Sequence, residues 1–426
     1  MTAATGDEVA VRHRSLDTIR GFAVMGILLM NIVAFAMPEM AYVSPAVYGS
    51  DGPADYWAWT AMFIAVDGKM RGLFSVLFGA SMLLVYERAQ QSAGNGRAVH
   101  VRRMLCLLVF GLIHFYLIWF GDILVLYALC GLLGTFVLTR ETRWLKRAMI
   151  VFFTLHFLVM AGLSLAMLAI KWAATQPGAT LETMTSYRET LTEIAPGGQA
   201  IAQEIALFRG DYLSFVRHNL TESLFHPLEF FLQGSLETMG LIALGIILFR
   251  NGFLTGQWSR QRYRRAMLLG YSIGVPPLAA LAAWVWSIGF DPFVVLGTFI
   301  AWSMPFRIAV MLGHAALLML VIQRFAESGA LERVEAAGKA AFSNYLGTSI
   351  LMTGLFYGWG LGWFGRLSRW QCLLVVPFVW LLMLLWSKPW LERFRYGPLE
   401  WLWRSLARGE VQAMRKSSIA IRSQTS

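Results

Sequence analysis

Apolar segments of about 20 residues recur along most of this chain, and they constrain its fold more than any other feature. A helix needs roughly 20 mostly apolar residues to cross the hydrocarbon core of a bilayer, which is about 30 Å thick. About ten segments have this length, near residues 20–37, 62–86, 103–120, 122–139, 148–171, 226–249, 266–287, 301–323, 340–359 and 371–387. The sequence therefore predicts an all-α, polytopic membrane helix bundle of about ten transmembrane helices.

Composition agrees with a membrane protein and argues against a nucleic-acid-binding one. The chain is 57% hydrophobic and only 14% charged, whereas a soluble domain has about 25% charged residues. The net charge is +11, but the basic residues cluster at the ends of apolar segments and form no single stripe. We therefore expect the lipid bilayer, and no nucleic acid, as a partner.

Motifs for cofactors and metals are missing from the sequence. Cys106, Cys130 and Cys372 lie inside apolar segments, where they suggest neither a disulfide framework nor a zinc site. No glycine-rich phosphate loop and no metal-ligand spacing stands out. We expect no metal and no tightly bound cofactor, which disfavours ATP-driven transport and metal catalysis.

Basic residues in alternate loops set the predicted topology, because short loops rich in Lys and Arg stay in the cytoplasm. "RHR" precedes the first segment, "RETRWLKR" follows the fourth and "SRQRYRR" follows the sixth, while loops such as "FDP" between them are acidic or neutral. Both termini are therefore predicted to be cytoplasmic.

The same pattern divides the chain into four parts. Residues 1–171 form an N-terminal five-helix half, residues 226–410 form a C-terminal five-helix half, and residues 411–426 form a basic tail predicted to be disordered. Residues 172–225 are too polar to span, and their apolar spacing predicts amphipathic helices on the extracytoplasmic face. These helices act either as a lid or acceptor platform or as a structural cap.

The first apolar segment opens with "RSLDTIRGFAVMGILLMN" and raises a question about its charges. Asp17 and Arg20 are one helical turn apart at the cytoplasmic end. Asp17 suits the positive end of a helix, but Arg20 does not, so Arg20 needs a carboxylate or a phosphate as partner. Arg102 and Arg103 lie at the same membrane level, and together with Arg20 they predict a site for a donor phosphate such as that of CoA.

Ionisable residues inside the apolar segments mark places where function is expected, since each costs roughly 2.5–3.5 kcal/mol to insert. His114 lies past the midpoint of the third segment, and Asp122 follows it across a tight turn. A carboxylate that orients an imidazole is the arrangement that general base catalysis requires. We predict this pair as the catalytic site, the alternative being a histidine that bonds a neighbouring helix.

Three further charges fall in "AVDGKMRGLF". Asp67, Lys69 and Arg71 alternate and do not share a helical face, so the helix is either broken at Gly68 or its charges reach the headgroups. If they point inward, Lys69 or Arg71 can hold an anionic acceptor or an oxyanion.

Polar residues in later segments form two more groups. Glu229, Gln233 and Glu237 share one face of the sixth segment, and Arg307 and His314 share a face of the eighth. They predict either an interhelical ion pair or a substrate pathway. In "FSNYLGTS" the polar residues, with Asn344 among them, predict a helix-packing interface.

Several motifs resemble those of the YeiB-like family of bacterial inner-membrane proteins: "RSLDTIRGFAVMGILLMNI", "GKMRGLFSVLFGAS", "FGLIHFYLIWFGDILVLYALCG", and "AAGKAAFSNYLGTS" with "RYGPLEWLWR". The resemblance covers nearly the whole chain and implies a multi-pass protein of the bacterial cytoplasmic membrane. That family is in turn similar to the transmembrane acyltransferase superfamily. This second similarity implies an acyl-CoA-like donor in the cytoplasm and a lipid-linked or glycan acceptor on the other side.

The acyltransferase resemblance has one departure and leaves two alternatives. Bacterial glycan acyltransferases usually carry a histidine and a basic residue in the first helix, where this chain has Asn31 and no histidine. One alternative is a transporter or flippase that uses Glu237, Arg307 and His314 as a polar pathway, although no internal repeat supports it. The other is a scaffold without turnover.

Overall fold

The protein is all-helical, as the sequence predicts. The computed structural model describes residues 6–416, so residues 417–426 of the predicted tail lie outside the described range. The helices are α1 (Gly6–Ala36), α2 (Glu39–Val43), α3 (Pro53–Ala65), α4 (Lys69–Ala93), α5 (Gly96–Leu117), α6 (Leu124–Gly134), α7 (Thr142–Ala174), α8 (Leu181–Ile194), α9 (Gly198–Phe208), α10 (Tyr212–Thr221), α11 (His226–Arg250), α12 (Arg260–Ser287), α13 (Pro292–Gly297), the π-helix η1 (Thr298–Trp302), α14 (Met304–Arg324), α15 (Gly329–Lys339), α16 (Ala341–Phe356), α17 (Arg369–Arg393) and α18 (Pro398–Arg408).

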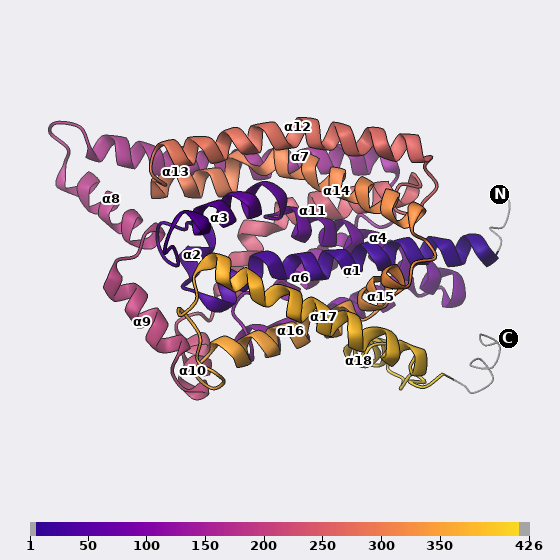
Figure 1. Ribbon diagram of the computed structural model, residues 1–426. Coiled ribbons are helices and arrows are strands. Elements are labelled where there is room, and N and C mark those ends of the chain that lie inside the picture. The colour runs from indigo at the N-terminus through magenta and orange to yellow at the C-terminus, as the bar shows by residue number, and fades with distance from the viewer. Residues whose placement is uncertain (1–5, 417–426) are drawn as a thin grey trace.

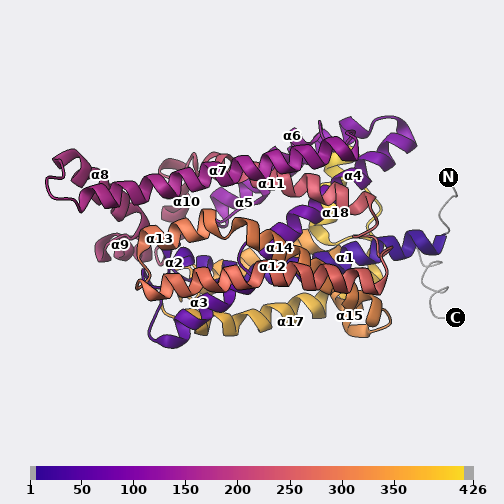
Figure 2. The same ribbon diagram turned by 90° about the horizontal axis from the view of Figure 1, so that it is seen from above.

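The long helices run side by side in a bundle (Figures 1 and 2). Within residues 6–416, eight helical stretches are long and apolar enough to cross a membrane: Arg14–Ala36, Pro53–Ser92, Gly96–Leu117, Thr142–Ala174, His226–Arg250, Arg260–Ser287, Met304–Arg324 and Arg369–Arg393. The predicted polytopic membrane helix bundle is thereby confirmed. The start of α1 and helix α18 lie at one end of the bundle, and α8, α9 and α10 lie at the opposite end (Figure 1).

Two predicted spans are shorter than expected. Residues 122–139 contain the 11-residue helix α6, and residues 340–359 contain the 16-residue helix α16. At 1.5 Å per residue a 16-residue helix is about 24 Å long, less than the hydrocarbon core. Helix α6 ends at Gly134, and a glycine-rich turn follows α16, so local backbone propensity ends both helices early.

Of the two alternatives for "AVDGKMRGLF", the structure has the helix break at Gly68. Helix α3 ends at Ala65 and α4 begins at Lys69, and between them Gly68 has a φ of 68°, which glycine adopts without strain. A Cβ atom at Gly68 would lie 2.7 Å from the Cδ atom of Arg307. The break turns Asp67 and Lys69 into the bundle, where they are 3% and 0% exposed.

The N-terminal part of α1 packs very closely against α15. A Cβ atom at Gly338 would lie 1.7 Å from the backbone oxygen of Asp17, and one at Gly21 would lie 2.1 Å from that of Val334. Arg14 also donates to Glu335 at 2.9 Å. These contacts fix the position of Asp17 and of Arg20 one turn later.

The predicted amphipathic helices are present as α8, α9 and α10, and α10 covers the end of α5. The Asn219 amide donates to the backbone oxygens of Phe115 and Tyr116, and the Tyr212 hydroxyl donates to that of Leu117. Carbonyl groups at the end of a helix lack partners within it, so these bonds stabilise the last turn of α5. His114 belongs to that turn.

Candidate functional site

His114 and Asp122 form the buried pair that the sequence predicts. The Nδ1 atom of His114 lies 2.7 Å from Oδ1 of Asp122, and both side chains are 0% exposed. The second carboxylate oxygen accepts the backbone N–H of Val125 at 2.8 Å, which fixes Asp122 at the start of α6. A carboxylate accepts from Nδ1–H, so the geometry leaves Nε2 of the neutral imidazole as the acceptor atom.

Two aromatic residues flank this histidine. The ring centroid of Tyr345 lies 5.3 Å from that of His114, and the centroid of Trp119 lies 6.1 Å away. Trp119 also stacks on Phe35 at 3.8 Å, which fixes the indole. The sequence predicts only a packing role for both residues, because an aromatic residue in an apolar segment is ordinarily part of the core or of the interfacial belt.

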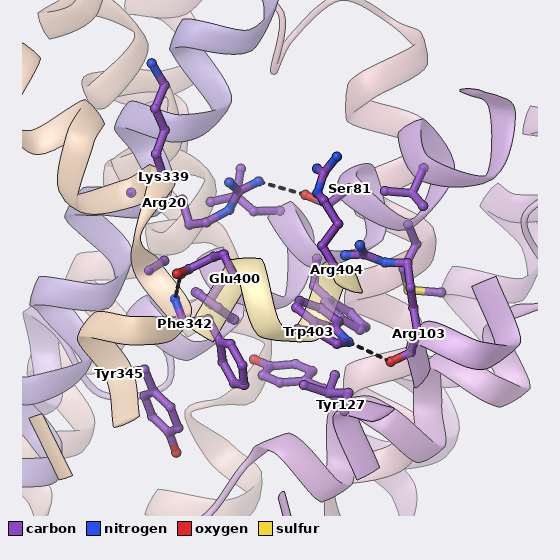
Figure 3. A pocket seen from close by; sticks show the side chains of 18 of the residues that line it. Arg20, Ser81, Arg103, Tyr127, Lys339, Phe342, Tyr345, Glu400, Trp403 and Arg404 are labelled. Atoms are coloured by element: carbon purple, nitrogen blue, oxygen red, sulfur yellow. Dashed lines mark hydrogen bonds between the residues drawn. The ribbon is translucent and has the colours of Figure 1, made fainter. Parts of the chain in front are cut away.

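A cavity of about 390 Å³ reaches Tyr345 from the end of the bundle where α18 lies. Figure 3 shows Arg20, Arg103 and Arg404 at one end of this cavity and Tyr345 at the other. We call it the basic cavity because its lining carries six cationic side chains against two carboxylates: Arg20, Arg88, Arg103, Lys339, Arg395 and Arg404 against Asp17 and Glu400. An excess of positive charge in a concave site favours anionic ligands.

Arg20 has the carboxylate partner that the sequence left open. It donates to Asp17 at 2.6 Å and to the hydroxyl of Ser81 at 2.8 Å. Both charges of this pair line the basic cavity. Arg20 therefore has a carboxylate partner and also lines a cavity that favours anions.

The structure separates Arg103 from Arg102. The guanidinium of Arg103 lies 4.2 Å from the centre of the Trp403 ring and lines the cavity. Arg102 is exposed and is not part of the cavity wall. One residue turns an α-helix by about 100°, so two consecutive arginines at the same level point in different directions. The sequence predicts both arginines for one phosphate site only because they lie at the same membrane level.

Helix α18 supplies lining residues that the sequence analysis missed. Trp403 donates from its indole to the backbone oxygen of Arg103 at 2.9 Å. Glu400 accepts the backbone N–H groups of Phe342 and Ser343 at 2.7 and 3.0 Å at the start of α16. Burial raises the pKa of the Glu400 carboxyl, and the bonds from Ser343 partly offset it. The segment "PLEWLWR" is rich in tryptophan, which also suits an interfacial helix, so its sequence did not identify it as a cavity wall.

The charges in "AVDGKMRGLF" join a second, largely buried group, in which only Arg71 is partly exposed. We call it the Glu237 cluster: Asp67, Lys69, Arg71, Glu237 and Arg307. Glu237 accepts from Arg71 and, at 2.8 and 3.2 Å, from Arg307, so it links α4, α11 and α14. Lys69 donates to the backbone oxygen of Phe63 at 2.5 Å. None of the five residues lines the basic cavity.

His314 has partners other than the predicted carboxylates. Its Nδ1 lies 2.8 Å from the Tyr271 hydroxyl, and its Nε2 lies 2.8 Å from the backbone oxygen of Ala65. Glu229, at the start of α11, instead lies 3.7 Å from His226. Glu237 is deeper in the same helix and pairs with arginines, so the predicted stripe divides into an exposed end and a buried end.

The two asparagines singled out in the sequence have different surroundings. Asn344 donates to the backbone oxygen of Ala337 and accepts from Trp386 at 2.8 Å, which joins α15, α16 and α17 as a packing interface does. Asn31 lines a small cavity of about 10 Å³ together with Phe35 and Tyr345.

Comparisons with known proteins agree with the motif resemblance. The family model described as a protein of unknown function (DUF418) matches residues 248–410. The uncharacterized protein YeiB of Escherichia coli (strain K12) is 32% identical over 417 residues, which cover 96% of this chain and 99% of that protein. The uncharacterized protein YxaH of Bacillus subtilis (strain 168) is 30% identical over 403 residues, 92% of each chain. No solved structure matches this chain.

Proposed function

This chain belongs to the YeiB-like family of bacterial membrane proteins, and we propose that it transfers an acyl group across the bacterial inner membrane. The donor is a cytoplasmic thioester of the acyl-CoA kind. The acceptor is a hydroxyl or amine of a lipid-linked or glycan molecule on the other side. The observation that carries the proposal is the buried His114–Asp122 pair beside the Tyr345 end of the basic cavity.

The basic cavity suits the charge and shape of such a donor. Guanidinium groups bind phosphate oxygens with strong charge-assisted hydrogen bonds, and the arginines gather at the end where α18 lies. Toward Tyr345 the lining becomes apolar, with Leu107, Leu124 and Phe342, as an acyl chain requires. The volume of about 390 Å³ lies within the range of about 300–1,000 Å³ usual for ligand pockets.

The His114–Asp122 pair supports general base catalysis of the transfer. Nε2 of His114 takes the proton from the acceptor hydroxyl while the acceptor oxygen bonds to the thioester carbon. The C–S bond then breaks, the ester carbonyl forms again, and the thiolate of CoA takes the proton back from His114. Asp122 holds Nδ1–H throughout, so it stabilises the imidazolium that forms between the two steps.

A two-step route uses the same atoms. Nε2 attacks the thioester carbon, the C–S bond breaks and CoA leaves as the thiolate, while Nδ1–H of the acyl-imidazolium stays bonded to Asp122. The acceptor hydroxyl then takes the acyl group, and its proton goes to the thiolate. Rapid quenching with radiolabelled acetyl-CoA and no acceptor distinguishes the routes, because only the second leaves label on the protein.

The proposal is tested by transfer from radiolabelled acetyl-CoA in liposomes made with membrane extract from the producing bacterium. The wild-type protein is expected to label a lipid or glycan fraction, and His114→Ala is expected to lower the rate by about 10²-fold or more. His156→Ala is the matched control, because His156 is also a buried histidine, 4% exposed, but lies on α7 outside the site. Undiminished transfer by His114→Ala would overturn the proposal.

A transporter or flippase is the second candidate, and one observation favours it. Asp67 in the Glu237 cluster is 3% exposed, and its Oδ2 atom has no hydrogen-bond partner among the described residues. Unpartnered carboxylates at membrane depth are typical of ion pathways. This candidate predicts solute flux in liposomes that Glu237→Gln abolishes, without any dependence on acyl-CoA.

A further inference from the structure

Three buried polar atoms around His114 have no hydrogen bond of good geometry: Nε2 of His114, Nε1 of Trp119 and the hydroxyl of Tyr345. The backbone of Ile123 approaches the Tyr345 oxygen, which leaves the proton of that hydroxyl free to donate. The three residues are 0%, 1% and 7% exposed. Polar groups buried this deeply are almost always hydrogen-bonded, because leaving them unpaired lowers stability. Three exceptions around one imidazole therefore point to a ligand.

The chemical types of these atoms define what the ligand is. Nε2 of His114 is an acceptor, since Nδ1 carries the proton toward Asp122. The indole N–H of Trp119 can only donate, and the hydroxyl of Tyr345 can donate as well. One base and two donors match a carbonyl under attack by a proton-bearing nucleophile: the base takes the proton, and the donors bind the oxygen that becomes negative.

We propose that Trp119 and Tyr345 donate hydrogen bonds to the carbonyl oxygen of the acyl group while it is transferred at His114. This inference rests on the proposed function and adds two catalytic residues to it. As the nucleophile attacks, the electron pair of the C=O bond moves onto the oxygen. It returns when the C–S bond breaks, and neither donor gives up its proton.

The position of Tyr345 agrees with this role. It lines both the basic cavity and the small cavity of about 10 Å³ that Phe35 also lines. Its hydroxyl points away from the arginine end of the basic cavity (Figure 3). The small cavity has room for little more than one oxygen-sized group. Of the three residues, only Tyr345 lines either cavity, so a thioester that enters past the arginines contacts Tyr345 first.

The test compares Tyr345→Phe with Tyr357→Phe in the labelled-acetyl-CoA assay. Tyr357 is the matched control, because its hydroxyl is also buried without a partner, but it lines neither the basic cavity nor the small cavity, and its ring packs against Phe208, Phe215 and Trp359. Tyr345→Phe is expected to lower kcat by about 10²-fold with little change in KM, as loss of one oxyanion donor does. Tyr357→Phe is expected to keep the wild-type kcat.

Three further measurements complete the test. Tyr345→Phe is expected to melt no lower than wild type, because it removes an unpartnered hydroxyl and nothing else, which excludes misfolding as the cause. Trp119→Phe is expected to lower kcat in the same direction. In the His114→Ala background, Tyr345→Phe is expected to add little, since both residues act in one step.

The outcomes separate this inference from the proposed function. A wild-type kcat in Tyr345→Phe, alongside loss of transfer in His114→Ala, overturns the donor roles and leaves the acyl transfer standing. Absence of transfer by the wild-type protein overturns both. An equal loss in Tyr345→Phe and Tyr357→Phe also overturns the inference, because it shows a general effect of buried hydroxyls.

Discussion

The Glu237 cluster and the surroundings of His114 are both buried groups of polar side chains, but they satisfy their polar atoms differently. In the cluster Glu237 accepts from two arginines and Lys69 donates to a backbone oxygen, so its charges are mostly paired within the protein. Around His114 the Asp122 contact is satisfied, whereas Nε2 and two neighbouring donors are not.

The difference teaches where to look for chemistry in a membrane bundle. Charge alone selects both regions, because every ionisable group at membrane depth is costly and therefore calls for an explanation. Pairing distinguishes them: a charge whose partners are other helices holds the bundle together, whereas several unpartnered polar atoms gathered around one side chain indicate a ligand site.

The largest effect on stability is expected from Glu237→Ala. The change leaves the guanidinium groups of Arg71 and Arg307 without their shared carboxylate, and breaking a buried ion pair from one side costs about 3–5 kcal/mol. Thermal unfolding in detergent measures it. Glu229→Ala is the control, since the Glu229 side chain is 57% exposed and is expected to change stability little. A stable Glu237→Ala protein that has lost activity would make the cluster a pathway.

Asp122→Asn is expected to have the opposite profile, with a large loss of activity and a small loss of stability. The amide N–H donates to Nδ1 of His114, so the proton moves to Nε2, and that atom can no longer act as a base. A loss of kcat on the order of 10³-fold, about 4 kcal/mol, is expected from the wrong tautomer. Transfer rate and melting temperature, measured on one preparation, check it. A normal kcat would show that the pair is structural.

The sequence predicts the membrane helix bundle and the His114–Asp122 pair because both depend on local signals. Apolar length predicts membrane helices, and a turn that follows His114 brings Asp122 back against it within eight residues. The break at Gly68 was one of two alternatives that the local pattern offered, since Asp67 and Lys69 cannot both face the interior on one straight helix.

The rest of the site depends on contacts that no local pattern records. Trp403 and Glu400 reach the basic cavity because α18 folds back onto α5 and α16, about 300 and 60 residues away in sequence. Tyr345 and Trp119 look like ordinary core residues until their unpartnered atoms are seen next to His114. Arg102 and Arg103 differ in the direction in which their side chains leave the helix. The approximate bounds of a predicted apolar segment do not define that direction.

Arg103→Ala is expected to weaken donor binding, and Arg102→Ala is its matched control. Arg103 lines the basic cavity, whereas Arg102 is exposed beside it. One charge-assisted hydrogen bond to phosphate contributes about 1.5–3 kcal/mol, so a rise of about 10-fold or more in KM for acetyl-CoA is expected. Equal KM values for the two variants would remove the basic cavity from the donor site.

The smallest effect concerns Glu204 on α9, a carboxyl outside the membrane helices. Burial raises the pKa of Glu204 to about 7, and the backbone N–H of Glu39, which it accepts at 2.7 Å, partly offsets this. The folded protein thus binds this proton more tightly than the unfolded chain, whose glutamate has a pKa of 4.5. Its contribution to stability is full below pH 4.5 and is lost as the pH rises toward 7.

Glu204 is half-buried in a pocket that His218 and His226 also line, so solvent screening keeps the expected loss below about 1 kcal/mol. Melting temperature in detergent between pH 4.5 and pH 7 measures it, and Glu204→Gln is expected to remove part of the pH dependence. Glu189→Gln, an exposed change on α8, is expected to leave the pH profile as it is. An unchanged profile in Glu204→Gln would show that Glu204 titrates as a free glutamate does. The difference between polar groups with and without a hydrogen-bond partner would then matter only inside the bundle, where water cannot supply the missing hydrogen bond.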